Sequence, residues 1–284
     1  MDTSSSQGRT MSKLNAPSAF IAAYGPWAII TGASDGTGAA FARKLASLGL
    51  NIVLIARREG PLSALSQELK QQYGVETRTA SIDLYQPGAG QRVIDAADGL
   101  DIGLFVSNAG SDPHGAAFLT APLLAWQEML QRNITALVEP AHHFAATMVE
   151  RGCGGIIVMS SGAALGGQAG GVVYSATKAF GLNFAESLWA ELSPKGVDVI
   201  CAVCGAMNTP SLNKLLDERN LSVPGLLEPD DVIETLLQRF GDTPLHVFAF
   251  QGNDAHAHKV EDERRQRLAL MEKMSKAFYG DVAH

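Results

Sequence analysis

A tyrosine and a lysine stand four positions apart near the middle of the chain. They are Tyr174 and Lys178, in the stretch GVVYSATKAF. Residues four apart on an α-helix share one face, so the two side chains would point the same way. An ammonium beside a phenol favours the phenolate and lowers a pKa that is ordinarily about 10. The spacing indicates an acid–base group, and the alternative is an ordinary helix surface.

Seven apolar runs alternate along the chain with segments of helical periodicity. Near-continuous apolar strands separated by helices predict a parallel sheet covered on both faces. We therefore expect an α/β fold: a Rossmann-like, doubly wound, seven-stranded parallel sheet flanked by helices in a single domain. The expected strands are residues 27–32, 51–58, 76–84, 101–110, 154–161, 197–205 and 245–252; the expected helices are 38–49, 61–74, 87–98, 121–151, 174–193, 229–240 and 258–280.

The two ends of the chain differ in character from this expected domain at 21–252. Residues 1–20 begin with a polar stretch and lack the apolar core of a secretory signal, so we expect a disordered leader. Residues 253–284 are rich in charge with an apolar helical pattern, which predicts a C-terminal helical tail. Such a tail could pack on the body, cover the pocket, reach a neighbouring subunit or stay solvated.

The composition excludes several classes of protein. The chain has 284 residues, 46% of them hydrophobic and 18% charged, which is enough material for a full core. A formal net charge of −7 without a basic block argues against nucleic acid as a partner. No apolar run approaches the ~18 residues of a membrane helix. We expect a cytoplasmic protein that does not bind membranes.

The three cysteines do not predict a metal or disulfide site. Cys201 and Cys204 have the spacing of a redox or metal pair, but they lie in the apolar run VDVICAVCG. On a strand, residues three apart point to opposite faces, so these two would not act together. Cys153 lies in a glycine-rich turn, and an odd, low count fits a reducing compartment. The histidines are scattered, and we predict no bound metal.

The first expected strand runs into a glycine-rich turn, TGASDGTG at 31–38. Gly32, Gly36 and Gly38 follow the pattern G-x-x-x-G-x-G. Glycines there let the turn tighten and let the backbone approach a pyrophosphate, while the next helix offers free N–H groups and a partial positive charge. Between the first strand and first helix of such a sheet, this turn favours dinucleotide binding over a purely structural turn.

The end of the second strand bears on which dinucleotide binds. Proteins that bind NAD usually have Asp or Glu there, whereas this chain has Arg57 and Arg58. A guanidinium suits a 2′-phosphate, although a solvated arginine is the alternative. Asp35 would repel that phosphate unless it caps the helix beginning at Gly36. We expect NADP(H) to be preferred, with NAD(H) as the other possibility.

Several motifs occur in one order along the chain. TGASDGTG is followed by Asp83-Leu84, by SNAG at 107–110, by Asn133, by Ser161 and by Tyr174-x-x-x-Lys178. Together they resemble the short-chain dehydrogenase/reductase family over about residues 26–252. In that family the catalytic serine usually lies about thirteen residues before the tyrosine, which selects Ser161 over Ser160, and the asparagine about forty before it. TGASDG combined with ARR is similar to ketoacyl and hydroxysteroid reductases.

The resemblance implies a role for each matching position. Tyr174 would be the acid in carbonyl reduction and the base in alcohol oxidation, with Lys178 tuning its pKa and donating to ribose hydroxyls. Ser161 would donate to the substrate oxygen, and Asn133 would hold a water that links Lys178 to solvent. The implied catalytic residues are Asn133, Ser161, Tyr174 and Lys178; the implied cofactor-binding residues are Gly32, Ser34, Asp35, Gly36, Thr37, Gly38, Arg57, Arg58, Asp83, Leu84, Asn108, Ala109, Gly110, Tyr174, Lys178, Gly205, Met207 and Thr209.

Three positions depart from the family pattern. Thr37 stands where a bulky aliphatic residue is usual, and Ser107 where an asparagine is common. Cys204 replaces a proline that often precedes Gly205. None of these departures removes a chemical group that the reaction needs, but they bear on cofactor affinity and on the nicotinamide pocket.

The segments after the catalytic strands predict a hydrophobic substrate. Residues 111–120, 162–171 and 207–227 carry apolar side chains and few charges that could bind an anion. We expect a hydrophobic or aromatic ketone or alcohol, turned over by an NADP(H)-dependent oxidoreductase. By resemblance, the helices at 121–151 and 174–193 would build a homodimer or homotetramer. The alternatives are a lyase or epimerase on the same fold with a tightly held cofactor, and a non-catalytic nucleotide-binding regulator.

Overall fold

One parallel sheet of seven strands forms the centre of the molecule. The computed structural model describes residues 17–249 and 252–279, with side chains described to residue 275. In their order across the sheet, the strands are β3 (Thr77–Ser81), β2 (Asn51–Ala56), β1 (Trp27–Thr31), β4 (Ile102–Ser107), β5 (Gly154–Ser161), β6 (Val197–Cys204) and β7 (Leu245–Val247). Every neighbouring pair is parallel. The order reverses between β1 and β4, which confirms the doubly wound sheet.

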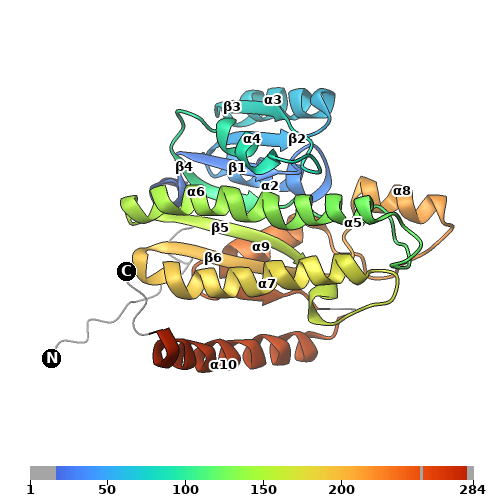
Figure 1. Cartoon of the computed structure of the whole chain (residues 1–284). Helices are drawn as coiled ribbons and strands as arrows, with labels where there is room; N and C mark the ends of the chain where they lie inside the picture. The colour runs from blue at the N-terminus through green and yellow to red at the C-terminus, as the bar shows by residue number, and fades with distance from the viewer. Residues whose placement is uncertain (1–16, 250–251, 280–284) are drawn as a thin grey trace.

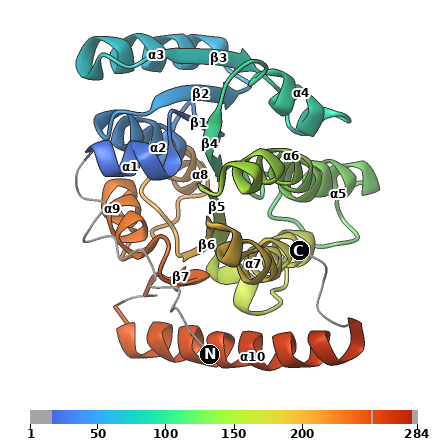
Figure 2. The same ribbon diagram turned by 90° about the vertical axis from the view of Figure 1, so that its left-hand side faces the viewer.

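Helices cover both faces of this sheet (Figures 1 and 2). One apolar core includes α1 (Pro17–Tyr24), α2 (Gly36–Ser47), α3 (Glu59–Tyr73) and α9 (Pro229–Arg239), and the other includes α4 (Ala89–Asp95), α6 (Ala136–Arg151) and α7 (Val172–Leu192). Successive strand residues alternate between the two cores: Ile30 packs in the first and Ile29 in the second. Cys201 and Cys204 likewise lie in opposite cores.

The long helical region expected at 121–151 is two helices joined by a wider turn. It consists of α5 (Leu123–Leu130), a π-helical turn (Gln131–Thr135) and α6. Pi-helical turns inside α-helices often mark functional positions, because the extra residue changes the direction of the side chains around it. The remaining helices are α8 (Pro210–Glu218), which the sequence pattern did not predict, and α10 (Asp254–Tyr279), which forms the tail.

Several boundaries differ from the expected ones. Residues 17–20, expected in the disordered leader, begin α1 because Phe20 and Tyr24 are fully buried and Tyr24 stacks on Phe240 at 4.8 Å. Residues 1–16 lie outside the described part. The third strand ends at Ser81 rather than 84, since Ile82 to Leu84 turn into the next loop. The last strand ends at Val247 rather than 252, and residues 250–251 of that prediction lie outside the described part.

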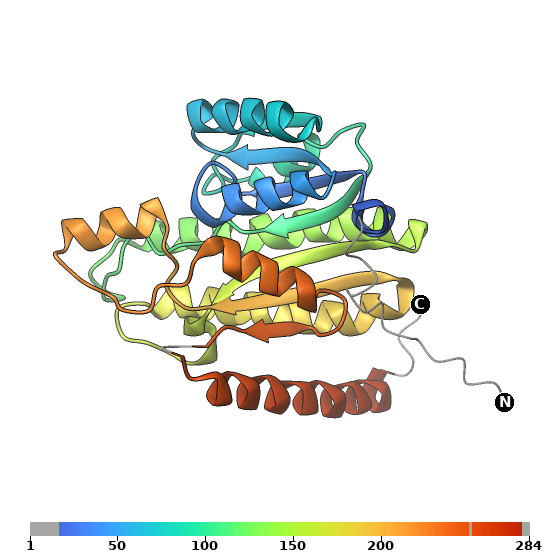
Figure 3. The same cartoon turned by 180° about the vertical axis from the view of Figure 1, so that it is seen from behind.

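The tail helix α10 packs on the body of the molecule, beyond β7 at the edge of the sheet (Figures 2 and 3). Arg264 donates two hydrogen bonds of 2.7 and 2.6 Å to Glu186 on α7. The buried Glu261 carboxylate accepts the Val247 N–H at 2.7 Å and lies 2.8 Å from His246 Nδ1. None of the helices in the described part combines the length and apolar character needed to cross a membrane.

Candidate active site

The predicted catalytic groups meet at the carboxyl ends of the central strands. Ser161 is the last residue of β5, and Tyr174 and Lys178 lie in the first turns of α7. In an open parallel sheet this edge is where ligands bind, near the reversal of strand order. A short 3₁₀ turn (Gly162–Leu165) follows Ser161, whose hydroxyl caps it by accepting the Ala163 N–H at 3.3 Å.

Tyr174 is a half-buried phenol beside the Ser161 hydroxyl. Burial raises its pKa above the usual value, and the hydrogen bond with Ser161 opposes that effect. Among nearby charges, Asp112 raises the pKa of Tyr174 and Arg132 lowers it. The expectation that the pKa of Tyr174 is lowered is therefore wrong, because the loss of solvation outweighs the nearby positive charge. Lys178 Nζ lies 5.8 Å from the centre of the Tyr174 ring.

Lys178 is a buried ammonium with one main-chain acceptor. Its Nζ donates to the Met159 carbonyl at 2.9 Å. Burial lowers its pKa to about 8, and the charge of Arg132 acts in the same direction. Ser160 Oγ donates to the Lys178 carbonyl at 2.9 Å. The two adjacent serines therefore differ: Ser160 supports the backbone of α7, whereas Ser161 adjoins the Tyr174 hydroxyl.

Asn133 and Gly110 complete this cluster. Asn133 lies in the π-helical turn, and its Nδ2 donates to Thr177 Oγ1 at 2.9 Å. A Cβ atom on Gly110 would stand 2.8 Å from Lys178 Nζ and 3.5 Å from Asn133 Oδ1. Gly110 is thus next to both side chains, and its lack of a side chain leaves that space open. The four predicted catalytic residues are brought together by β5, α7 and the turn before α6.

Arg132 is a member of the cluster that the sequence did not predict. Its side chain is buried, donates to Asn133 Oδ1 at 2.9 Å and to the Ser111 carbonyl, and lies over the Tyr85 ring at 4.5 Å. An arginine on a helix is ordinarily solvated, so nothing in the local pattern distinguishes this one. Its burial depends on contacts that are distant in the chain.

The glycine-rich turn has the tight geometry expected of a phosphate loop. Gly32 and Gly36 have φ of +70° and +50°, in the left-handed region that favours glycine. A Cβ on Gly38 would lie 2.1 Å from the Gly32 carbonyl oxygen, so only glycine fits there. Asp35 accepts the Gly36 N–H at 2.7 Å and caps α2, while its second oxygen pairs with Arg58 at 3.1 Å. Ser34 Oγ lies 3.4 Å from Arg58 Nη2.

Residues from other strand ends close around this turn. Asn108 donates through Nδ2 to the Thr31 and Gly32 carbonyls at 3.1 and 3.2 Å, which ties the end of β4 to the turn after β1. Thr37 Oγ1 lies 3.5 Å from Met207 Sδ. The Thr209 side chain lies 2.9 Å from the position of a Cβ on Gly36. The predicted residues after β1, β4 and β6 are therefore neighbours, with the half-exposed Ala109 and Gly205 in the same segments.

Two residues of the predicted cofactor site, Asp83 and Leu84, follow β3. Asp83 Oδ1 accepts the Tyr85 N–H at 3.2 Å, and Leu84 is buried. Arg57 is exposed after β2, and its guanidinium lies 5.4 Å from the Tyr85 ring centre. The turn glycines, the free N–H groups of the first turn of α2 and the exposed guanidinium form a donor set that fits the phosphates of a dinucleotide.

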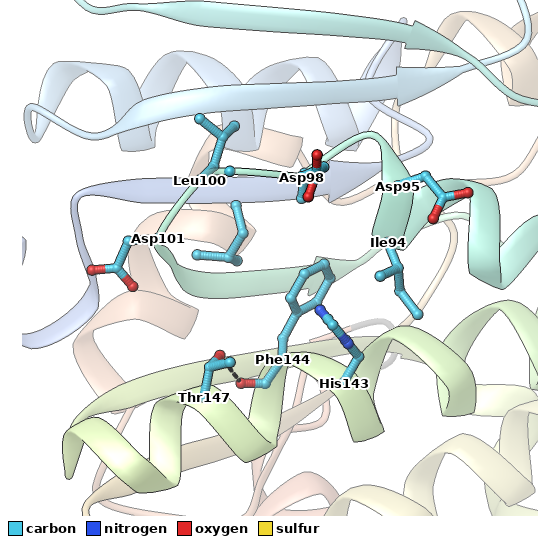
Figure 4. Close-up of a pocket in the computed structure, with 11 residues that line it drawn as sticks. Ile94, Asp95, Asp98, Leu100, Asp101, His143, Phe144 and Thr147 are labelled. Atoms are coloured by element: carbon cyan, nitrogen blue, oxygen red, sulfur yellow. Dashed lines mark hydrogen bonds between the residues drawn. The ribbon is translucent and has the colours of Figure 1, made fainter.

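Two cavities lie outside the catalytic cluster. One of about 420 Å³ is lined by Asp95, Asp98, Asp101 and His143 (Figure 4). Because it includes Asp101 and Ile102 at the amino end of β4, it lies at the opposite edge of the sheet from Ser107 to Gly110. The other, about 370 Å³, lies between the segment 162–168 and the start of α10 and includes Leu165 and Phe248. Among the described residues, no three His, Cys, Asp or Glu side chains gather as metal ligands.

A doubly wound sheet with phenol, hydroxyl and ammonium groups at its ligand-binding edge defines an α/β oxidoreductase of the Rossmann type. The sequence model of the short chain dehydrogenase family matches residues 26–220, and the chain belongs to this family. The 7β-hydroxysteroid dehydrogenase of Collinsella aerofaciens is 32% identical over 248 residues, covering 84% of this chain and 94% of that protein. The human very-long-chain 3-oxoacyl-CoA reductase is 35% identical over 178 residues, covering 62% of this chain and 57% of that protein.

Solved structures give the same assignment. A 7β-hydroxysteroid dehydrogenase structure superposes with a TM-score of 0.77 at 30% identity, covering 88% of this chain and 98% of that one. A short-chain dehydrogenase from Sphingobium yanoikuyae in complex with NADPH gives a TM-score of 0.74 at 29% identity, covering 91% and 100% of the two chains. The predicted family, fold and enzymatic nature are confirmed.

Proposed function

We propose that this enzyme moves a hydride between NADP(H) and the carbonyl or secondary alcohol of a hydrophobic small molecule. The observation that carries this proposal is the placement of the Tyr174 and Ser161 hydroxyls beside each other at the carboxyl edge of the sheet, next to a buried Lys178. A phenol beside a hydroxyl suits a carbonyl oxygen that gains charge and a proton.

The roles follow from what each group can donate. When bound, the nicotinamide ring supplies or takes up the hydride. The Tyr174 hydroxyl gives its proton to the substrate oxygen in reduction and takes it back in alcohol oxidation. The Ser161 hydroxyl donates to the same oxygen, where negative charge develops. Lys178, with one of its N–H groups on the Met159 carbonyl, has further donors for the ribose hydroxyls beside Gly110.

The second strand end supports a preference for NADP(H) over NAD(H). Arg57 is exposed there, and no described carboxylate forms an ion pair with it. Asp35, which would otherwise repel a 2′-phosphate, is engaged with the Gly36 N–H and with Arg58. The Sphingobium relative was solved with NADPH. Arg57 therefore has the charge and the access to bind the 2′-phosphate.

The exposed apolar residues of the segments after the catalytic strands support a bulky hydrophobic substrate. Phe118 and Leu165 are partly exposed in the segments 111–120 and 162–171, and α8 buries none of its residues. Relatives of this chain include enzymes named for hydroxysteroids and for very-long-chain 3-oxoacyl-CoA. We infer a steroid-like or long-chain keto substrate. A homo-oligomer is supported by the exposed Leu123, Leu124 and Phe180 on α5 and α7. The three free cysteines support a location in the reducing cytoplasm.

The test is oxidation of NADPH with a panel of ketosteroids and long-chain 3-oxoacyl-CoA esters, followed by absorbance. We expect one equivalent of NADP⁺ for each alcohol formed, and we expect Tyr174→Phe to lower kcat by about 10²–10⁴-fold with little change in NADPH affinity. A Tyr174→Phe enzyme with full activity would remove Tyr174 as the proton donor. Turnover without net NADPH oxidation would favour a lyase or epimerase, and NADPH binding without any turnover would favour a regulator.

A further inference from the structure

Arg132 is a buried cation that the proposed reaction does not use. Its residue is 8% exposed, and no carboxylate in the described part of the chain lies within ion-pair distance of it. Burial of a charge without a partner of opposite charge is costly. Its donors are occupied by neutral acceptors: the Tyr85 hydroxyl, Ser111 and the Asn133 amide oxygen. It therefore has little capacity left to bind a substrate anion.

Hydrogen bonds connect this guanidinium to the helix turn that carries Tyr174. Arg132 Nε donates to Asn133 Oδ1 at 2.9 Å, and Asn133 Nδ2 donates to Thr177 Oγ1 at 2.9 Å. Thr177 Oγ1 donates in turn to the Tyr174 carbonyl at 2.8 Å. Because Arg132 Nε occupies the amide oxygen, it fixes which way the Asn133 side chain faces.

Arg132 is also the cation common to both titrating groups. Around Tyr174, Asp112 disfavours the phenolate and Arg132 favours it. Around Lys178, Arg132 disfavours the ammonium. The Tyr85 ring, which Arg132 covers at 4.5 Å, holds the guanidinium in this place.

We propose that Arg132 is a positioning residue for the acid–base pair: it orients the Asn133 amide and supplies a fixed positive charge beside Tyr174 and Lys178. The role of Tyr174 in this inference rests on the proposed function. The family's own set of serine, tyrosine, lysine and asparagine does not include this arginine.

The substrate-free test is the ultraviolet titration of tyrosinate in the whole protein. The titration is done on the wild type, Arg132→Met and Arg132→Lys, and on each of these three proteins with Tyr174→Phe added. Subtracting the titration curve with Tyr174→Phe from the curve without it leaves the signal of Tyr174, separated from Tyr85 and the other tyrosines. Arg132→Met should raise the pKa of Tyr174 by about one unit, because the nearby charge is lost. Arg132→Lys should keep it within a few tenths. If the pKa of Tyr174 does not change in Arg132→Met, or if it rises equally in Arg132→Lys, the proposed role of the Arg132 charge is overturned.

A second measurement reports the orienting role and covers a failure of Arg132→Met to fold. Arg132→Lys loses the Nε bond to Asn133, so we expect its kcat for ketosteroid reduction to fall roughly tenfold while NADPH affinity, read by fluorescence, stays unchanged. Full kcat in Arg132→Lys overturns that role. The titration does not depend on turnover, so the two proposals fail separately. An active Tyr174→Phe enzyme would contradict only the proposed function. An unchanged pKa of Tyr174 in Arg132→Met would contradict only the role of Arg132.

Discussion

The two ends of the candidate active site hold charge in different ways. At the phosphate turn, Arg58 is 58% exposed in its side chain and pairs with Asp35, while glycines shape the backbone. At the catalytic end, Lys178 and Arg132 are 7% and 8% exposed and no described carboxylate pairs with either. Exposed charges attract a ligand and are screened by water, whereas buried charges shift the pKa of their neighbours. Substitutions at the two ends should therefore change different measured quantities.

After Tyr174 itself, the largest effect at the catalytic end should come from the hydroxyl next to it. Ser161→Ala removes a donor to the developing charge, so we expect kcat to fall about 10²–10³-fold, with cofactor affinity unchanged. The matched control is the neighbouring Ser160→Ala, which loses a buried hydrogen bond to the Lys178 carbonyl. That variant should lower the free energy of unfolding by about 1 kcal/mol and reduce kcat far less. Equal losses of kcat in both would show that the two serines do not have separate roles.

At the phosphate turn, a single methyl group should be harmful. Gly38→Ala places a Cβ where the Gly32 carbonyl stands 2.1 Å away, so the turn must move. We expect the free energy of unfolding to fall by about 1–3 kcal/mol and dinucleotide binding to be lost. Gly60→Ala on α3, whose Cβ would meet nothing within 4 Å, should instead be neutral or stabilising by about 0.4–1 kcal/mol. Calorimetry of unfolding and NADPH fluorescence measure both, and an intact affinity in Gly38→Ala would contradict the phosphate role.

The exposed arginine of that end should affect cofactor choice more than catalysis. Arg57→Glu places a carboxylate against the 2′-phosphate, so we expect the Kd for NADPH to rise roughly tenfold while that for NADH barely changes. Lys259→Glu makes an equal change of charge on the distant α10, and it controls for the effect of net charge on dinucleotide affinity. Equal weakening of NADPH and NADH by Arg57→Glu would exclude Arg57 from the 2′-phosphate site.

The sequence predicted the parts of the site that depend on local order. Ser161, Tyr174 and Lys178 meet because strand ends share one edge of a parallel sheet and residues four apart share a helix face. The glycine turn was predictable for the same reason: its position between the first strand and the first helix is visible in the sequence.

The sequence did not predict what depends on contacts between distant residues. Arg132 is buried through contacts with Tyr85 and Ser111, which are 47 and 21 positions away. The raised pKa of Tyr174 follows from burial by surrounding elements, whereas the spacing alone pointed to a lowered value. Likewise, α1 is ordered because Tyr24 stacks on Phe240 from the far end of the domain.

The buried Lys178 ammonium should make the stability of the cofactor-free protein depend on pH. The pKa of Lys178 is lowered from 10.5 to about 8 by burial, with Arg132 acting in the same direction. Between those two pH values the unfolded chain binds more protons than the folded one, so the free energy of unfolding rises with pH. Below about pH 8 both states are protonated, and the full cost of burying the charge is present.

We therefore expect the wild type to gain stability relative to Lys178→Met as the pH increases from about 8 to 10.5. Urea unfolding of both proteins at a series of pH values measures this difference, because the other titrating groups are common to both. For the exposed Lys259, the difference in the free energy of unfolding between the wild type and Lys259→Met should not change with pH. A flat difference for Lys178 as well would mean that water reaches its ammonium, and the catalytic end would then hold its charge in the same screened way as the phosphate turn.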